Sequence, residues 1–349
     1  MLIRWRHVVA TLVALPLLGF FIGWLGIIPL GASGGHWAVT DWFLHWVMRN
    51  STRTAALRVE TPPPLDDPAR LPLAAGQFEM GCARCHGSPA QGRSAATLAM
   101  LPPPPDLGRV VPTWTDAELF QIVQHGIRYT GMPAWPTTNR EDEVWSMVAF
   151  LRKVPGMHAD TYRELAGLSA TPSGTVEPPS MTCDSCHAES RLDAGSLIPS
   201  LAGQSVAYLL ESLRAYAEDK RPSGVMQTAM SALDKDDFPA LAAAYAARPR
   251  QRLAPESADP QALDHGRRLA ETGDAARRIP ACLTCHEKRD GNPSYPRLSG
   301  QSPAYLATQL RLFVSGKRGG GPYADLMKTA AENLDEADIQ ALSAYFASR

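Results

Sequence analysis

The motif Cys-x-x-Cys-His occurs three times in this chain, and the three copies together use all six of its cysteines. Successive copies lie about 100 residues apart, with a proline-rich segment between them. A chain of 349 residues is long enough for several domains. The spacing therefore predicts small modules, each built around one motif. The motif residues are Cys82, Cys85 and His86; Cys183, Cys186 and His187; and Cys282, Cys285 and His286.

Several chemistries use paired cysteines, and the surrounding pattern distinguishes them. A structural zinc site needs four ligands, commonly from two paired knuckles, whereas each module here has one pair and one histidine. A thioredoxin-like site would lie in a βαβ pattern, which the sequence does not show. Plain disulfides would leave unexplained why a histidine follows the second cysteine in all three copies.

Covalent attachment of haem c accounts for every part of the motif. The two thiols add to the vinyl groups of the porphyrin, and the residue that follows becomes an axial ligand of the iron. We therefore expect three covalently bound haem c groups, each with its iron. The expected proximal ligands are His86, His187 and His286.

Histidine leaves one axial position of the iron, and methionine is the expected ligand there. Met/His ligation fills the last coordination position of the iron and raises its reduction potential. In the first module, "YTGMPAW" places Met132 between a glycine and a proline, 46 residues after His86. Proline stiffens such a loop, and glycine lets its backbone approach a flat ring. Met100, Met147 and Met157 compete with Met132, but Met147 lies in a periodic helix, where core packing explains it.

The second and third modules are internal repeats, which helps to identify their methionines. Residues 201–221 align without a gap to residues 298–318, with 11 of 21 positions identical. Shared positions in a duplicated unit do the same job twice. Met226 and Met327 each stand seven residues before the leucine of a Leu-Asp pair, whereas Met230 corresponds to an alanine in the third module. We therefore predict Met226 and Met327 as iron ligands.

Two stretches resemble class I cytochromes c. Residues 180–349 resemble the dihaem cytochrome c-four group through "PSLAGQ" and "PRLSGQ", the "AYL…LR" helix, the methionine before "LD", and the closing "AAYAA" and "SAYFA". Residues 70–160 resemble single-haem class I domains with "GMPAW" before a final "VWSMVAFL" helix. The resemblance implies that the second and third modules pack face to face, with their haems close together.

The same resemblance implies how the helices pack. In class I domains an N-terminal helix crosses the closing helix, with a small residue and an aromatic residue at the contact. Ala74 and Phe78 fit these positions in the first module. In the second module, "VEPPSMTC" has prolines where the first helix belongs, so we expect that helix to be missing or short.

Readable periodicity elsewhere is helical. Thr115 and Glu118 form a capping box that opens a helix over residues 115–126. No run of strict alternation is long enough for a strand, so the exported part is expected to be all-α. Linkers are expected at residues 61–72, 169–180 and 248–260. The resulting units are a cytoplasmic N-terminus with an anchor (1–35), an interfacial helix with a linker (36–72), and three cytochrome c domains (73–165, 178–250 and 260–349).

Residues 8–30 carry no ionisable side chain and are long enough to cross a hydrocarbon core of about 30 Å. Arg4 and Arg6 precede them, and the next basic residue is Arg49. The positive-inside rule then places the N-terminus in the cytoplasm and the haem domains in the periplasm. A cleaved signal peptide with "LGA" at 30–32 is the competing interpretation. Its apolar region usually spans only about 7–15 residues, which favours an uncleaved single-pass anchor in the inner membrane.

Residues 36–50 have a broad apolar face formed by Trp37, Trp42 and Trp46. Five of the eight tryptophans lie in the first 46 residues, where an aromatic belt would sit. This pattern predicts a helix lying along the outer leaflet, and it fits equally a helix that docks on a membrane-bound partner subunit.

The formal net charge of −1 gives no reason to expect nucleic acid as a partner. The basic pairs at 220–221 and 317–318 are candidates for orienting a docking partner, although paired basic residues usually just lie in solvent. Four repeated residues are candidates for hydrogen bonds to haem propionates, although turn and helix packing explains them as well. They are Gln204, Tyr208, Gln301 and Tyr305.

These features predict a membrane-anchored triple-haem electron carrier in a periplasmic respiratory chain. Its expected donor is a quinol-oxidising complex or a dehydrogenase, and its expected acceptor is a terminal oxidase or a soluble cytochrome. The alternative is the cytochrome subunit of a periplasmic dehydrogenase complex of the alcohol or gluconate type. Haem catalysis would need an iron without a strong sixth ligand, and three well-placed methionines disfavour it.

Overall fold

The structure is a computed structural model that describes residues 4–26, 28, 31, 34, 35, 37–168, 178–250, 259–288 and 290–349, with the backbone alone for 178–182. Within these residues every regular element is a helix, and one isolated bridge joins Asp274 to Ile279. The all-α expectation is therefore confirmed. Most of the expected linkers at 169–180 and 248–260, and part of the C-terminal end of the 8–30 span, lie outside the described residues.

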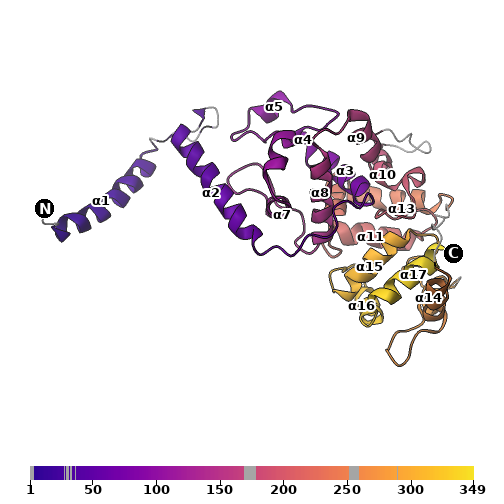
Figure 1. Cartoon of the computed structure of the whole chain (residues 1–349). Helices are drawn as coiled ribbons and strands as arrows, with labels where there is room; N and C mark the ends of the chain where they lie inside the picture. Colours follow the sequence, from indigo (N-terminus) through magenta and orange to yellow (C-terminus); the bar gives the residue numbers. More distant parts are fainter. Residues whose placement is uncertain are drawn as a thin grey trace.

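The chain begins with two helices, α1 (Trp5–Trp24) and α2 (Ala38–Ala56). Helix α1 has 20 residues, is long and apolar enough to cross a membrane, and has none of its residues buried. It projects away from the rest of the molecule (Figure 1).

The first module packs around the crossing of its first long helix, α3, with α8. Ala74 and Phe78 on α3 are buried, and the Phe78 ring centroid lies 5.3 Å from that of Phe150 on α8. The small residue and the aromatic residue therefore occupy the expected crossing. The helices are α3 (Arg70–Gly81), α4 (Ala83–His86), α5 (Ala95–Leu98), α6 (Leu107–Val110), the 3₁₀ turn η2 (Val111–Thr113), α7 (Asp116–His125), α8 (Glu141–Lys153) and α9 (Ala159–Leu165).

Two helix starts in this module test the sequence analysis. The capping box before α7 is confirmed: Thr115 N–H donates to Glu118 Oε2 at 2.7 Å, and Glu118 N–H donates to Thr115 Oγ1 at 3.3 Å. Helix α3 begins at Arg70, inside the expected linker 61–72 and ahead of the expected domain start at residue 73. The reason is that Pro72 lies in the first turn, where no intrahelical N–H is needed.

Helix α2 is longer than the expected interfacial segment, and its second half packs on α7 of the first module. Thr52 is buried there, the Arg49 guanidinium lies 5.0 Å above the Trp114 ring, and Arg53 lies 3.6 Å from Glu118. The first half of α2 instead exposes Trp42 and Trp46. The aromatic surface is therefore held in a fixed position against the first module.

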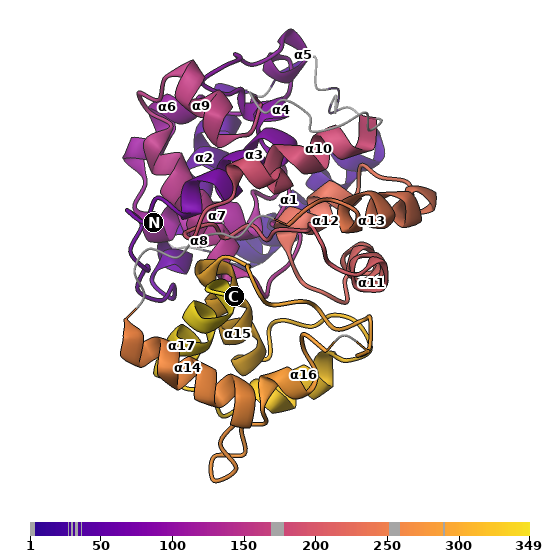
Figure 2. The same cartoon turned by 90° about the vertical axis from the view of Figure 1, so that its right-hand side faces the viewer.

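The second and third modules have the same arrangement of core helices, as their repeated sequences predict. Helix α11 pairs with α13 in the second module, and α15 with α17 in the third. Figure 2 shows the third module lying beside the first two. The second module contains α10 (Pro178–His187), η3 (Glu189–Arg191), α11 (Val206–Ala217), α12 (Gly224–Met230), η4 (Lys235–Asp237) and α13 (Phe238–Ala246); the third contains α14 (Pro260–Thr272), η5 (Cys282–Thr284), α15 (Pro303–Val314), α16 (Ala324–Ala331) and α17 (Glu336–Ala347).

The first helix of the second module is short, as expected. Helix α10 has only five residues before Cys183, whereas α14 of the third module has 13 residues and crosses α17. Helix α3 of the first module packs in the region that α10 leaves open. Leu73 of α3 contacts the small core of Cys186, Leu192 and Ile198. The second module is thus completed by side chains of the first.

Candidate haem sites

Each of the three motif histidines makes the same hydrogen bond, with its ring Nδ1 against the carbonyl oxygen of a proline further along the chain. A carbonyl oxygen only accepts, so each Nδ1 carries the hydrogen, and each Nε2 keeps the lone pair that binds a metal. The distances are 3.3 Å for His86 and Pro105, 3.0 Å for His187 and Pro199, and 2.9 Å for His286 and Pro296.

Burial also favours the form of histidine that binds iron. It lowers the pKa of His86, His187 and His286, while the hydrogen bond to the proline carbonyl opposes that effect. The imidazoles are therefore neutral around pH 7, as ligation requires. Orientation and protonation state together prepare these three side chains as metal ligands.

The cysteines of each motif lie on one turn of helix. His86 N–H donates to Cys82 O at 2.9 Å, and His286 N–H donates to Cys282 O at 3.0 Å, while the second motif ends α10. Burial raises the pKa of Cys82 to about 12 and the pKa values of Cys183 and Cys282 to about 11. Such thiols differ from the low-pKa thiolates of redox-active pairs.

The other uses of paired cysteines find little support. Cys82 and Cys85 have free thiols, and so do Cys282 and Cys285, which disfavours plain disulfides in two of the modules. Among the described residues, no three His, Cys, Asp or Glu side chains are grouped so that they could hold a metal ion by themselves. A zinc site of four protein ligands is therefore not formed there.

A cavity of about 490 Å³ lies between the second and third modules and joins their two motifs. Its walls are mainly apolar, as in cofactor sites generally. Met226 on α12 and Met327 on α16 both line it, together with the motif residues Cys183, Cys186, His187, Cys282, Cys285 and His286. One continuous space is thus lined by the motif residues of two modules and by the methionine predicted as a ligand in each. Met230, one turn after Met226, is buried on the same wall.

The loop that holds Met132 in the first module is fixed by its backbone. Ile127 N–H donates to Met132 O at 3.2 Å. Gly126 has a φ of +63°, and a side-chain carbon there would lie only 2.5 Å from the carbonyl carbon of Pro133. Only glycine fits both constraints. The methionine is therefore held on an ordered loop.

Two arginines that we expected in solvent are buried beside the cavity. Arg221 is 5% exposed and Arg318 is 8% exposed, whereas the adjacent Lys220 and Lys317 are exposed. The expectation was wrong for the arginines, because the turn after each repeated helix directs the second residue of the basic pair inward. Both guanidiniums line the cavity.

Arg221 donates to Tyr305 Oη at 3.3 Å and to Ser212 Oγ at 3.1 Å. Arg318 donates to Gln309 Oε1. Burial and the nearby Arg221 lower the pKa of Arg318. Among the described residues neither arginine forms an ion pair with a carboxylate, and buried charges are usually paired. Haem propionates would supply the missing anions, so these residues fit the group that the motifs imply.

Gln204 and Gln301 make hydrogen bonds between the second and third modules, in line with the packing interpretation. Gln204 Nε2 donates to Arg297 O at 2.8 Å, and Arg297 N–H donates back to Gln204 Oε1 at 2.9 Å. Gln301 makes the same exchange with Ser200, at 2.7 and 3.1 Å. Both amides join the two repeated modules to each other.

Sequence reasoning missed several residues of these sites. The carbonyls of Pro199 and Pro296 lie inside the repeated "PSLAGQ" and "PRLSGQ" segments, so the repeat did contain a signal for them. Arg221 and Arg318 are also repeated, but a basic pair does not reveal which of its members is buried. Glu143 on α8, whose buried carboxylate contacts the second module, has no signal in the sequence that separates it from the neighbouring acids Glu141 and Asp142.

Comparison with known proteins assigns the chain to a family. Residues 70–151 match the family described as cytochrome c oxidase, cbb3-type, subunit III. A thiosulfate dehydrogenase electron acceptor from Stutzerimonas stutzeri is 33% identical over 178 residues, which is 50% of this chain and 82% of the relative. Cytochrome c4 from Pseudomonas aeruginosa is 31% identical over 166 residues, covering 47% of this chain and 81% of the relative.

A solved cytochrome c4 structure from Acidithiobacillus ferrooxidans has 31% identity and a TM-score of 0.40, and covers 44% of this chain and 89% of that chain. This chain covers most of the length of both sequence relatives, one of which is a cytochrome c4. With the family match in the first module, they show that the chain is a class I cytochrome c with covalently bound haem c and a segment of the cytochrome c4 type.

Proposed function

We propose that the chain is a membrane-anchored electron carrier with three haem c groups, one in each of the units 73–165, 178–250 and 260–349. The iron ligands are His86 with Met132, His187 with Met226, and His286 with Met327. The observation that carries the proposal is the hydrogen bond from Nδ1 to a proline carbonyl, which occurs at all three motifs. Haem supplies one-electron chemistry, while this chain orients the ligands and excludes water.

The shared cavity supports close contact between the second and third haems. Motif residues of both modules line one continuous space, and the buried Arg221 and Arg318 lie at its wall. The first haem would lie on the side of the molecule that carries α2 and its exposed tryptophans. In this proposal one haem would lie near the membrane and the other two further away.

Helices α1 and α2 support a membrane location for this carrier. The apolar helix α1 would span the inner membrane, with the N-terminus in the cytoplasm and the haem units in the periplasm. Exposed Trp37, Trp42 and Trp46 would lie at the outer interface or against a membrane-bound partner. Electrons would come from a quinol-oxidising complex or a dehydrogenase and pass to a terminal oxidase or a soluble cytochrome.

A second candidate is the dedicated cytochrome subunit of a periplasmic dehydrogenase complex. The observation in its favour is that two relatives are described as electron acceptors of thiosulfate dehydrogenase. Affinity purification of the chain from detergent-solubilised membranes, followed by partner identification, separates the two candidates. A stoichiometric dehydrogenase subunit would favour the second candidate, and an oxidase or a quinol-oxidising complex would favour the independent carrier.

Ligation is tested by single substitutions of Met132, Met226 and Met327 to alanine. Each variant should lose the methionine-ligation absorption of one haem and allow carbon monoxide to bind that haem after reduction. Met147→Ala is the control, because Met147 is buried in the first core and should cause neither change. Stoichiometric carbon monoxide binding to a reduced haem of the unmodified protein would contradict the His/Met assignment and favour haem catalysis.

A further inference from the structure

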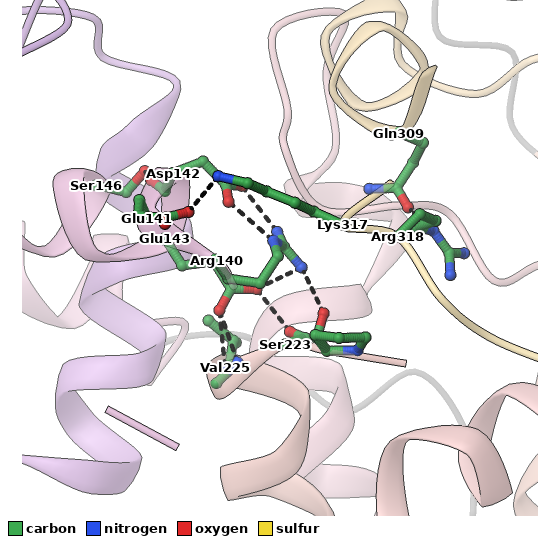
Figure 3. A network of polar contacts seen from close by, with 12 residues as sticks. Arg140, Glu141, Asp142, Glu143, Ser146, Ser223, Val225, Gln309, Lys317 and Arg318 are labelled. Carbon is green, nitrogen blue, oxygen red and sulfur yellow. Dashed lines mark hydrogen bonds and ion pairs between the residues drawn. The ribbon is translucent and has the colours of Figure 1, made fainter. Parts of the chain in front are cut away.

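The buried carboxylate of Glu143 on α8 joins the first module to the start of α12, the helix that carries Met226. Glu143 is 3% exposed. Its Oε2 accepts from Gly224 N–H at 2.7 Å and from Val225 N–H at 3.4 Å. These are the first two residues of α12, whose N–H groups have no partner within the helix. Glu143 thus supplies acceptors from a different module (Figure 3).

A second contact links Glu143 to Met226 itself. Ser223 Oγ donates to Glu143 Oε1 at 2.6 Å and accepts from Met226 N–H at 3.2 Å. One hydroxyl therefore connects the carboxylate to the backbone of the proposed iron ligand. The backbone of Met226 is thus linked to a residue more than 80 places earlier in the chain.

Arg140 and Trp135 hold Glu143 in this position. Arg140 Nη1 lies 2.8 Å from Glu143 Oε1 and donates to Pro222 O at 3.0 Å, so it contacts both modules. Trp135 Nε1 donates to Glu143 Oε2 at 3.3 Å. Burial raises the pKa of Glu143, while Arg140 and the donors from Ser223 and Gly224 oppose the rise. A carboxylate surrounded by this many donors is costly to remove.

The first module also forms part of the cavity wall on this side. Leu73 and Met80 of α3 line the cavity, and Gln77 Nε2 donates to Thr228 Oγ1 of α12 at 3.0 Å. The third module lacks an equivalent of this network among its described contacts with the first. The ion pair between these modules joins the exposed side chains of Lys317 and Glu141, at 2.9 Å.

We propose that Glu143 is a positioning residue for Met226, so that the first module controls axial ligation of the haem in the second. The inference rests on the proposed function, because it takes Met226 as an iron ligand. It implies that the second haem site is complete only when the first module is docked, whereas ligation by Met327 is independent of that docking.

The test is Glu143→Gln in the full-length holoprotein, with Glu141→Gln as matched control on the same helix. Methionine-ligation absorption and the midpoint potential of each haem are measured. We expect Glu143→Gln to weaken ligation at one haem and to lower its potential, because Met/His ligation raises the potential. A purely electrostatic role would have the opposite sign, since loss of a negative charge favours the reduced iron. A raised potential with intact ligation would therefore overturn the proposal.

Double substitutions identify the haem that responds. The effect of Glu143→Gln should disappear in a Met226→Ala background and persist in a Met327→Ala background. The opposite pattern would overturn the proposal. If Glu143→Gln does not fold, Ser223→Ala removes the same connection without changing a charge, and Ser223→Thr, which keeps the hydroxyl, should restore ligation. Ligation unchanged in Ser223→Ala would also contradict the role.

The haem content of the same samples distinguishes a failure of the proposed function from a failure of the role of Glu143 alone. Fewer than three haems in the unmodified protein would contradict the proposed function. Three haems, with Glu143→Gln indistinguishable from Glu141→Gln, would contradict the role of Glu143 alone.

Discussion

Gln204 of the second module and Arg297 of the third exchange two hydrogen bonds, at 2.8 and 2.9 Å, through the side-chain amide of one and the backbone of the other. Gln301 and Ser200 repeat the exchange in the opposite direction. Because residues 204 and 301 are equivalent in the repeat, the interface has the self-complementary form of a two-fold dimer within one chain.

This exchange predicts the effect of removing either amide. Gln204→Ala or Gln301→Ala should each lower the free energy of unfolding by about 1–3 kcal/mol, because backbone groups at the interface between the two modules lose their partners. Denaturant unfolding of the holoprotein measures the change. Gln340→Ala on the exposed face of α17 is the control, with an expected effect within about 0.5 kcal/mol. Equal effects of all three substitutions would contradict this account of the interface.

The contact between Trp135 and Gly224 predicts a strict size limit at residue 224. A side-chain carbon there would lie 2.0 Å from Trp135 Nε1. Gly224→Ala should therefore cost about 1–3 kcal/mol through overpacking and loosen the first module from the second. Gly92→Ala is the control, because no heavy atom lies within 4 Å of the added carbon. Thermal unfolding that does not distinguish the two variants would argue against close docking at this point.

The buried arginines predict a specific change in reduction potential. Arg221→Met and Arg318→Met should each lower a haem potential by on the order of 60 mV, equal to a tenfold change in a one-electron equilibrium, because a nearby cation favours the reduced iron. Lys220→Met should change the potentials little, since its exposed charge is screened by salt. Spectroelectrochemical titration gives the values. An effect of Lys220→Met as large as that of Arg221→Met would be inconsistent with a role for burial.

Asp338 predicts the acid sensitivity of the third module. Burial alone would raise its pKa, but Arg277 at hydrogen-bond distance, Asp335 N–H and His265 hold the pKa of Asp338 below its ordinary value. A depressed folded-state pKa contributes stability above the unfolded-state value of about 3.9, and that stability is lost as pH falls through the folded-state value. Asp338→Asn should thus lower stability at pH 7 by about 1–3 kcal/mol and flatten its pH dependence below about pH 4.

Unfolding measured by circular dichroism between pH 7 and pH 2 checks this. The matched control is Asp335→Asn, because Asp335 also contacts Arg277 but is far more exposed. A pH profile of Asp338→Asn that parallels the unmodified protein would show that the carboxylate does not control acid unfolding.

The sequence predicted the parts of the molecule that depend on local pattern or on repetition. The capping box was predictable because Thr115 and Glu118 lie only three positions apart. The helix crossing was predictable because Ala74 and Phe78 fit the contact expected from the resemblance to class I domains. The all-α class followed from the same periodicity. Pro199 and Pro296, which follow His187 and His286, are repeated in the sequence, but the repeat alone does not assign them a role.

Other features could not be predicted from the sequence because they depend on how the modules pack against one another. A basic pair such as Lys220 and Arg221 does not show which member turns inward until the two repeats are packed together. Glu143 resembles any helix-start acid in "EDEV", and only docking against Ser223 and Gly224 gives it a partner. The first residues of α3, from Arg70, lie inside the expected linker 61–72, because a proline in the first turn of a helix resembles a linker residue.

The most direct test of the account is the intact mass of the purified, denatured full-length chain, since haem c remains covalently attached. We predict the mass of the polypeptide plus three haem groups, and loss of one haem increment when Cys82 and Cys85 are both replaced by alanine. A mass that corresponds to two haem groups in the unmodified protein would contradict the central claim that each Cys-x-x-Cys-His motif holds its own haem.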